Sequence, residues 1–212
     1  MKNIGRVVLM AAGLAAASSA QTWEFGGVAG GGFLNHVGVN NSFGSATAGF
    51  QNGAVFGGYI GNNLYKHLGG ELRYGFMQGD LKLSSNGSTA SFAAQSHVVH
   101  YDVILHTNNS DKKVQLFAAA GGGMKIFRAT GREAAYQPLS QFGYFTKEQT
   151  LKPMASVGVG VKFQISRNVY LRTEIRDYIT PFPKEVIAPP AGTKYGMLLH
   201  DFVPMVGLGF LM

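Results

Sequence analysis

Histidines next to a hydroxyl or a carboxylate are the residues of this chain whose spacing could support chemistry. The candidate pairs are Ser96-His97, His100-x-Asp102 and His200-Asp201. A serine that is activated by a histidine, itself oriented by a carboxylate, could attack an acyl ester. The chain contains no cysteine, which excludes a thiol nucleophile, a disulfide framework and a thiolate metal site.

Two further patterns have residue types that could bind a metal ion or a phosphate group. His100 and His106 fall on one face of an extended segment, but they lie too far apart to hold one metal ion, and no third ligand is evident. The run Gly121-Gly122-Gly123-Met124-Lys125 lacks the spacing of a phosphate-binding loop and lies inside an extended segment. We therefore expect no metal ion and no cofactor.

The elements that must position these residues are extended, because apolar residues recur at every second position. Residues 156–165 carry valine, phenylalanine or isoleucine at each odd position and small or polar residues at each even one. A short polar interruption at 166–168 and a second alternating run over 169–176 predict a β-hairpin. Eight such runs follow along the chain, at about 22–33, 54–62, 69–83, 96–107, 114–129, 151–165, 169–180 and 197–210.

The gaps between these runs alternate in length. Short polar gaps lie at 63–68, 108–113 and 166–168, and gaps of about a dozen to about twenty residues lie at 34–53, 84–95, 130–150 and 181–196. Barrels of the outer membrane have this alternation, with short periplasmic turns and long extracellular loops. Seven of the runs have twelve residues or more, and a tilted membrane strand needs roughly 9 to 11. The sequence therefore predicts an all-β fold, a transmembrane eight-stranded antiparallel up-and-down β-barrel.

The composition and the first residues agree with an exported membrane barrel. The chain is 46% hydrophobic and 12% aromatic, which excludes overall disorder, and only 14% charged, which is low for a soluble domain. Lys2 and Arg6 precede a short apolar run that ends in Ser18-Ser19-Ala20, a pattern typical of a secretory signal peptide. We expect residues 1–20 to be this signal and residues 21–212 to be the barrel domain.

Alternate positions of each run separate an apolar face from a polar one. A barrel of eight strands is too narrow inside for many large apolar side chains, so the apolar face is predicted to contact lipid. Aromatic residues near the run ends are predicted to form interfacial girdles: Trp23, Phe25, Tyr59, Tyr65, Phe127, Tyr178 and Phe182. The lumen is predicted to hold a polar network with a structural or gating role: Glu24, Glu71, Arg73, His100, Asp102, Lys125, Lys162, Arg172, Glu174 and Arg176.

The same alternation separates the candidate catalytic residues. It points His97 outward, and His100 and Asp102 inward, so no hydrolytic pair assembles on the lipid-facing surface. His100 is instead predicted to join the luminal network. A plugged lumen is the favoured interpretation because eight strands leave little room for continuous water, and a narrow path gated by rearranged ion pairs is the alternative.

One hairpin also resembles a known family. Residues 156–178 read as a Gly/Val strand, a short polar turn and the strand Leu171-Arg172-Thr173-Glu174-Ile175-Arg176, and this hairpin resembles the outer membrane protein A-like and opacity-protein-like β-barrels. Residues 117–123 resemble the Gly-rich fifth strand of that family. The resemblance implies a structural, adhesive or host-interacting surface protein, with weak pore activity in some members. It also implies insertion by the barrel-assembly machinery, which recognises a terminal aromatic residue, here Phe210 followed by Leu211-Met212.

The sequence thus predicts a non-enzymatic protein of the bacterial outer membrane, with a structural or surface-interaction role exercised through its long loops. A small gated channel is the first alternative, and a lipid-A-modifying enzyme is the second. Expected partners are outer membrane lipid and lipopolysaccharide, the barrel-assembly machinery, and an extracellular ligand or host surface. The net charge of +7 is spread along the chain, which fits anionic lipopolysaccharide better than nucleic acid.

Overall fold

The computed structural model describes residues 22–107 and 112–212, which form fifteen β-strands. Within these ranges there is no helix with the length and hydropathy needed to cross a bilayer. The predicted export signal, residues 1–20, lies outside the described residues.

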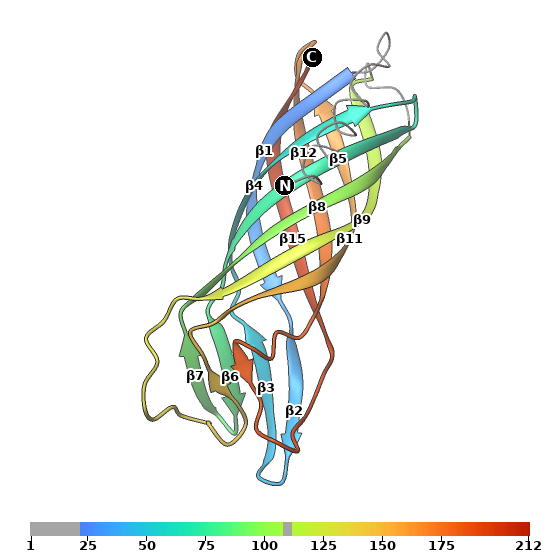
Figure 1. The fold of residues 1–212 in the computed structure, drawn as a ribbon. Coiled ribbons are helices and arrows are strands. Elements are labelled where there is room, and N and C mark those ends of the chain that lie inside the picture. The colour runs from blue at the N-terminus through green and yellow to red at the C-terminus, as the bar shows by residue number, and fades with distance from the viewer. Residues whose placement is uncertain (1–21, 108–111) are drawn as a thin grey trace, which may run out of the picture.

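Eight long strands close into an antiparallel barrel in the order β1-β15-β12-β11-β9-β8-β5-β4 (Figure 1). They are β1 (Thr22–Leu34), β4 (Gly53–Asn63), β5 (Leu68–Gln78), β8 (Ala94–His106), β9 (Val114–Ala129), β11 (Gln149–Gln164), β12 (Val169–Pro181) and β15 (Leu198–Leu211). Consecutive barrel strands pair with each other, and β15 closes the ring against β1. The predicted all-β fold and eight-stranded up-and-down barrel are confirmed.

The strand register shows how steeply the strands wind round the barrel. The register can be followed from Asp177 of β12 across each neighbouring strand until β1 is reached. Through β11, β9, β8, β5 and β4 it arrives at Trp23, and through β15 it arrives at Phe33. The ring therefore closes with a shift of ten residues along β1. Barrels with such a stagger have strands tilted by roughly 35–45°. Each residue then advances about 2.5 Å along the barrel axis, since a strand rises about 3.3 Å per residue.

The segments beyond one end of the barrel also form strands, which we call the cap. A five-stranded sheet has the order β14-β2-β3-β6-β7, and a two-stranded sheet pairs β10 with β13 (Figure 1). Their bounds are β2 (His36–Asn41), β3 (Gly44–Phe50), β6 (Leu81–Ser85), β7 (Ser88–Phe92), β10 (Tyr144–Phe145), β13 (Ile187–Ala188) and β14 (Lys194–Tyr195). Two of the predicted long loops, 34–53 and 84–95, are therefore mostly strand, whereas 130–150 and 181–196 add only the two-residue strands β10, β13 and β14 to the cap.

The predicted run 69–83 is wrong as a single barrel strand. Barrel strand β5 ends at Gln78, and Leu81 begins cap strand β6. Leu81 and Leu83 are fully buried in the cap. Because of them, the alternation of apolar and polar residues continues beyond the end of the barrel strand. Alternation alone could not locate the boundary because both elements bury one face.

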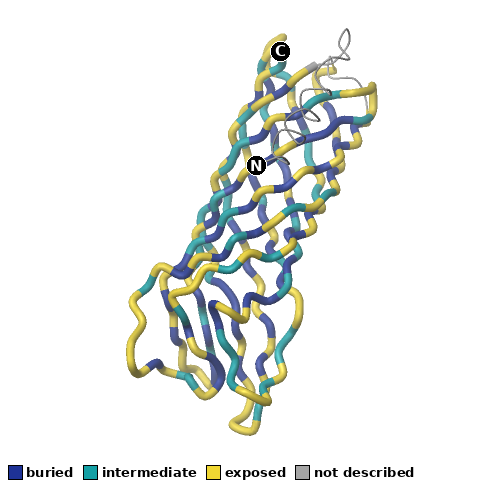
Figure 2. The backbone as a smooth tube through the Cα atoms, viewed as in Figure 1, coloured by how far each residue is buried: buried dark blue, intermediate teal, exposed yellow. Residues whose placement is uncertain are grey.

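Buried apolar side chains of the cap strands and loops form a hydrophobic core. Leu83 and Val186 have no exposed surface, and Phe92 stacks on Phe145 with ring centroids 5.8 Å apart. Phe50 of β3 stacks on Phe127 of β9 at 5.1 Å, so this core continues into the mouth of the barrel. Buried and exposed residues alternate along both parts of the molecule (Figure 2). The cap and the adjoining end of the lumen are thus one packed unit.

The outward surface of the barrel is apolar, as predicted, but part of the predicted aromatic girdle is wrong. Trp23, Phe25 and Tyr65 are exposed, whereas Tyr59, Phe127 and Tyr178 are only 1–3% exposed because they occupy inward positions, and Phe182 is buried in the cap. Inside, an aromatic ring can pack against a buried cation. The girdle prediction rested on how near these residues lie to the ends of the runs. Their parity in the alternation instead assigns them to the lumen.

Glycines at inward positions let neighbouring barrel strands approach closely. A Cβ added at Gly123 would lie 2.1 Å from the carbonyl oxygen of Val99, and one at Gly121 would lie 2.0 Å from that of Tyr101. At Gly122, which faces outward, the nearest atom would be the Met154 carbonyl oxygen at 3.3 Å. Strand β9 therefore needs glycine at inward positions 121 and 123 and has more room for a side chain at outward position 122.

Candidate functional site

The structure places all ten side chains of the predicted polar network in the lumen, where none is more than 5% exposed. Their charges balance once Asp201 is added. Within the described residues the lumen holds five carboxylates and five cationic side chains: Glu24, Glu71, Asp102, Glu174 and Asp201 against Arg73, Lys125, Lys162, Arg172 and Arg176. A balanced set of this kind satisfies the condition under which buried charges persist, namely pairing with hydrogen bonds.

Three arginines and two glutamates form the centre of the network. Arg73 Nη2 donates to Glu71 Oε1 at 2.9 Å, and Arg176 Nη2 donates to the same oxygen at 3.1 Å. Arg172 Nη2 donates to Glu174 Oε2 at 2.9 Å. Glu71 and Arg73 belong to β5, and the other three residues belong to β12, four strands away in a ring of eight. The cluster therefore spans the full width of the lumen.

Further ion pairs lie on both sides of this centre. Toward the cap, Asp102 accepts from Arg176 and from His100 Nδ1, the latter at 3.0 Å. Toward the other mouth, Lys162 Nζ donates to Glu24 Oε1 at 2.7 Å. Polar contacts thus extend over much of the length of the barrel.

Aromatic rings separate the charged layers. The hydroxyl groups of Tyr59 and Tyr170 lie 2.9 Å apart. The guanidinium of Arg172 lies 4.5 Å from the centroid of the Tyr59 ring and 4.4 Å from that of Phe117. Desolvated contacts between a cation and a ring are attractive, so these rings hold Arg172 in place as well as filling space.

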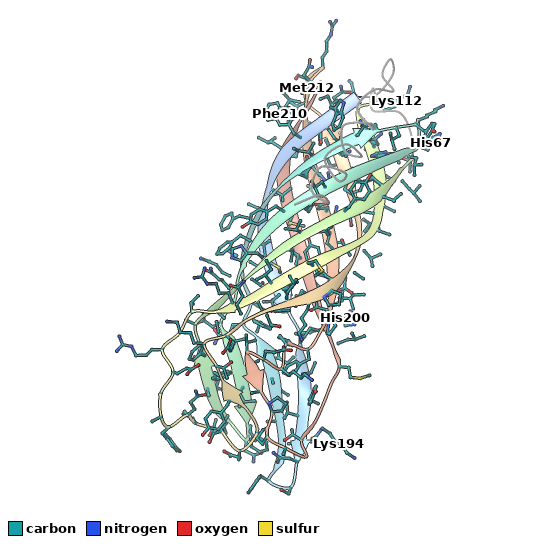
Figure 3. The ribbon with its side chains drawn as sticks, in the orientation of Figure 1. His67, Lys112, Lys194, His200, Phe210 and Met212 are labelled. Atoms are coloured by element: carbon teal, nitrogen blue, oxygen red, sulfur yellow. The ribbon has the colours of Figure 1, made fainter. Side chains whose placement is uncertain are left out.

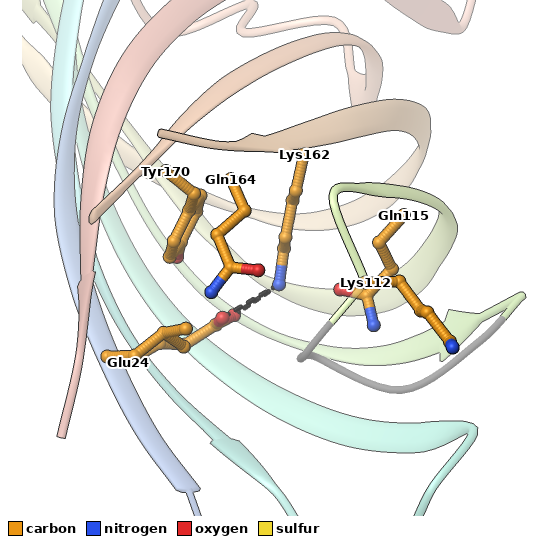
Figure 4. A pocket seen from close by; sticks show the side chains of 7 residues that line it. Glu24, Lys112, Gln115, Lys162, Gln164 and Tyr170 are labelled. Atoms are coloured by element: carbon orange, nitrogen blue, oxygen red, sulfur yellow. Dashed lines mark hydrogen bonds and ion pairs between the residues drawn. The ribbon is translucent and has the colours of Figure 1, made fainter. Parts of the chain in front are cut away.

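The mouth of the barrel away from the cap is closed. The cavity there has a volume of only about 10 Å³ and is lined by Glu24, Lys162, Tyr170 and their neighbours (Figure 4). This is about the space that one water molecule needs. The Lys162–Glu24 ion pair crosses the opening, so the described side chains leave no wide aqueous entrance at this end.

Asp201 is a luminal residue that was not predicted from the sequence, and its partner is not the adjacent His200. Asp201 lies inside and accepts a hydrogen bond from Lys125, whereas its neighbour His200 lies outside and contacts Asp177. The alternation of β15 contains this signal, because apolar Phe202 and Val206 share one parity and Asp201 falls on the opposite one.

Of the other candidate catalytic residues, His100 and Asp102 form a hydrogen bond inside the lumen, whereas Ser96 and His97 point to opposite sides of β8. Ser96 is buried, and the imidazole of His97 points outward, where its Nδ1 lies 2.8 Å from the hydroxyl of Tyr74. No group of three or more potential metal ligands occurs among residues 22–107 and 112–212. The described residues thus contain no serine–histidine pair of the kind that hydrolysis of an ester would use.

Electrostatic contacts also order the cap. Lys152 Nζ donates to Glu185 Oε1 at 2.7 Å. Burial acts to raise the pKa of Glu185, but the hydrogen bond and charge of Lys152 outweigh it and hold that pKa below its usual value. Burial lowers the pKa of His36, and the nearby charge of Lys82 lowers it further. At neutral pH a charged Glu185 therefore ties the segment before β13 to the end of β11.

The free surface of the cap carries aromatic and basic side chains. Phe43 and Tyr136 are 74% and 81% exposed, well above the values of aromatic residues on the barrel wall. Lys194 lies on the cap, at the opposite end of the molecule from His67 and Lys112 (Figure 3). Exposed basic residues of the cap segments include Arg132, Lys147, Lys184 and Lys194. Such a surface can contact anionic or apolar partners.

Comparison with known proteins gives a sequence family and several structures of the same architecture. The profile of the OmpA-like transmembrane domain matches residues 18–183. No curated protein sequence matches the chain. Neisserial surface protein A of Neisseria superposes with a TM-score of 0.54 at 11% identity, over 91% of this chain and 99% of that one.

Two further outer-membrane barrels superpose less closely. The N-terminal barrel of OprF from Pseudomonas aeruginosa gives a TM-score of 0.48 at 13% identity, over 91% and 97% of the two chains. The outer membrane protease OmpT of Escherichia coli gives 0.43 at 11% identity, over 91% and 96%.

Proposed function

Because this chain belongs to the family of OmpA-like transmembrane domains and is located in the outer membrane, we propose that it is a non-enzymatic barrel with a structural or surface-interaction role. The observation that carries this proposal is the cap. Its strands, core and ion pair give the extracellular side a fixed shape with exposed aromatic and basic residues. A preorganised surface loses less conformational entropy on binding than mobile loops would.

We also propose that the luminal network is a structural plug. Charge balance, near-complete burial and a closed mouth all support this role. Lipopolysaccharide, the barrel-assembly machinery and an extracellular ligand or host surface are the proposed partners.

The cap is tested by removing its two most exposed aromatic rings. Vesicles bearing the Phe43→Ala/Tyr136→Ala variant are expected to bind cultured epithelial cells at least about fivefold less than wild-type vesicles, since buried aromatic contacts dominate many interfaces. Tyr65→Ala is the matched control, because Tyr65 is 71% exposed on a turn at the opposite end of the barrel.

Binding is measured by fluorescence of labelled vesicles. If wild-type vesicles bind no better than vesicles without the protein, the surface-interaction role is wrong. The structural role then predicts that cells lacking the protein lose resistance to detergent, and unchanged resistance would overturn the whole proposal.

The plug is tested by conductance across planar bilayers. Wild-type protein is expected to give no regular current steps, whereas Arg172→Ala/Glu174→Ala removes one cation and one carboxylate together and is expected to open a small conductance. Regular steps in the wild type that vanish on Arg172→Ala or Glu174→Ala alone would instead support the gated channel.

A further inference from the structure

The short turns at the end of the barrel away from the cap form a second exposed surface, which we call the turn face. It consists of residues 64–67, 112–113 and 165–168, which belong to the hairpins β4–β5, β8–β9 and β11–β12. His67 and Lys112 lie at this end, and Lys194 of the cap lies at the opposite one (Figure 3). In outer-membrane barrels the short turns face the periplasm.

The turn face is strongly basic. Four exposed cations lie on it: Lys66, Lys112, Lys113 and Arg167. None of them pairs with a carboxylate among residues 22–107 and 112–212, and the sequence of the turns adds one carboxylate, Asp111. The four cap segments, by contrast, carry five cations and four carboxylates, and the charges of the lumen balance. Most of the excess positive charge of the described chain therefore lies on the turn face.

Hydrogen bonds to the backbone hold these cations on fixed turns. The N–H of Tyr65 donates to the carbonyl of Leu68 at 2.9 Å, and the N–H of Leu68 donates to the carbonyl of Tyr65 at 3.3 Å. This pair closes a tight turn with Lys66 at its tip. Arg167 also lies at the tip of its turn, where its carbonyl accepts from Gln164 Nε2 at 3.3 Å. A partner therefore meets cations on a preorganised backbone, which lowers the entropy lost on binding.

Lys112 lies at the mouth of the barrel and away from the lipid-facing wall. It lines the same small cavity as Glu24 and Lys162 (Figure 4). Lipid surrounds the wall of a barrel and does not cover its mouth. A partner that contacts Lys112 must therefore approach along the barrel axis, from the aqueous side.

The order of the strands sets the spacing of the turns. Hairpins β4–β5 and β8–β9 are centred two strands apart, and so are hairpins β8–β9 and β11–β12. Since neighbouring strands lie about 4.8 Å apart, successive turns lie about 10 Å apart round the mouth. Two carboxylates that are seven residues apart on one face of an α-helix have nearly the same separation, because a helix rises about 1.5 Å per residue.

We infer that the turn face binds an acidic polypeptide segment, one with carboxylates about 10 Å apart on one face. Leu64 and Tyr65 are 42% and 71% exposed beside Lys66, so the turn face also offers apolar contacts that the side chains of a polypeptide can fill. A carbohydrate polymer would leave these apolar contacts largely unused. The turn face lies at the opposite end of the molecule from the cap, so this inference goes beyond the proposed function.

Binding of a labelled peptide to the full chain in nanodiscs of neutral phosphatidylcholine tests this inference, because a nanodisc leaves both ends of the barrel accessible. The probe is a helical peptide of about twenty residues with glutamates seven positions apart, and the reference peptide has glutamines in their place. Wild-type protein is expected to bind the glutamate peptide about tenfold more tightly, measured by fluorescence anisotropy, since several exposed ion pairs of modest strength add up.

The test variant neutralises the four cations of the turn face: Lys66→Gln/Lys112→Gln/Lys113→Gln/Arg167→Gln. It is expected to bind the two peptides equally. The matched control removes the same charge from the cap: Arg132→Gln/Lys147→Gln/Lys184→Gln/Lys194→Gln. It is expected to keep the wild-type preference, because charges at the far end of the barrel are screened over about 10 Å at 0.1 M salt.

A wild-type protein without preference for the glutamate peptide would overturn the inference, and so would an equal loss in the two variants. A pull-down on purified peptidoglycan examines the other source of carboxylates. Retention that depends on the same four cations, without binding of the glutamate peptide, would assign the turn face to the cell-wall polymer and overturn the inference. If the fourfold variant fails to fold, Lys66→Gln/Arg167→Gln carries the same test, with an expected loss of about threefold.

Discussion

Replacing Glu71 with alanine is expected to lower the free energy of unfolding by about 3–5 kcal/mol, because breaking a buried ion pair leaves its partners uncompensated. Glu71 has no exposed surface and accepts hydrogen bonds from Arg73, Arg172 and Arg176. Alanine would leave these three guanidinium groups with only Glu174 at the centre of the lumen, aided by Asp102 at its edge.

The measurement is unfolding in urea of protein inserted in lipid vesicles, followed by the heat-dependent shift in gel migration that folded barrels show. Glu24→Ala is the matched control, since Glu24 is also buried but pairs with a single lysine at the end of the network. It is expected to cost about 1–2 kcal/mol. Equal losses in the two variants would show that the three-arginine centre has no special weight.

Gly123→Ala is expected to prevent the barrel from closing, and Gly122→Ala is expected to leave it intact. At Gly123 the new methyl group would overlap the backbone of β8, including the carbonyl oxygen of Val99, and backbone atoms cannot turn aside as a side chain can. The cost should exceed the roughly 1–3 kcal/mol that is typical of overpacking. At Gly122 the methyl group points toward lipid, and the change should stay within about 1 kcal/mol.

The measurement is the folded fraction of each variant after refolding into vesicles, which should be much lower for Gly123→Ala than for Gly122→Ala. The two substitutions are chemically identical and lie on adjacent residues, so differences in strand propensity cancel between them. Comparable folded fractions would mean that strands β8 and β9 separate easily and that the close approach is unnecessary.

Period-two alternation predicted most of the barrel because each strand lies between lipid and a narrow lumen. It assigned Glu71, Arg172 and their partners to the lumen without any knowledge of which charges pair. Asp201 falls on the inward parity of the same alternation, but it was paired with its neighbour His200 and was not assigned to the lumen. Adjacent residues of a strand point to opposite sides, so neighbours in sequence are poor candidates for contact.

The cap could not be predicted in the same way. Its core brings Leu83, Phe145 and Val186 together from three different segments between barrel strands, and no local pattern records that pairing. The pair of Asp177 and His200 has the same origin, since the two residues are 23 positions apart and meet only through the β12–β15 register. Contacts of this kind depend on tertiary pairing rather than on periodicity.

The position of the arginine cluster on opposite walls has a consequence for the order of folding. Arg73 and Glu174 are 101 residues apart, on strands that face each other across the ring. Contacts with so large a sequence separation form late, after the intervening strands have paired. Until β15 meets β1, these charges lie on an open, hydrated sheet, and their desolvation and pairing take place in the step that closes it. Closure of the ring and loss of water from the luminal charges therefore occur in the same step. A variant that lacks one charge of the arginine cluster would be slowed before this step, while the sheet is still open.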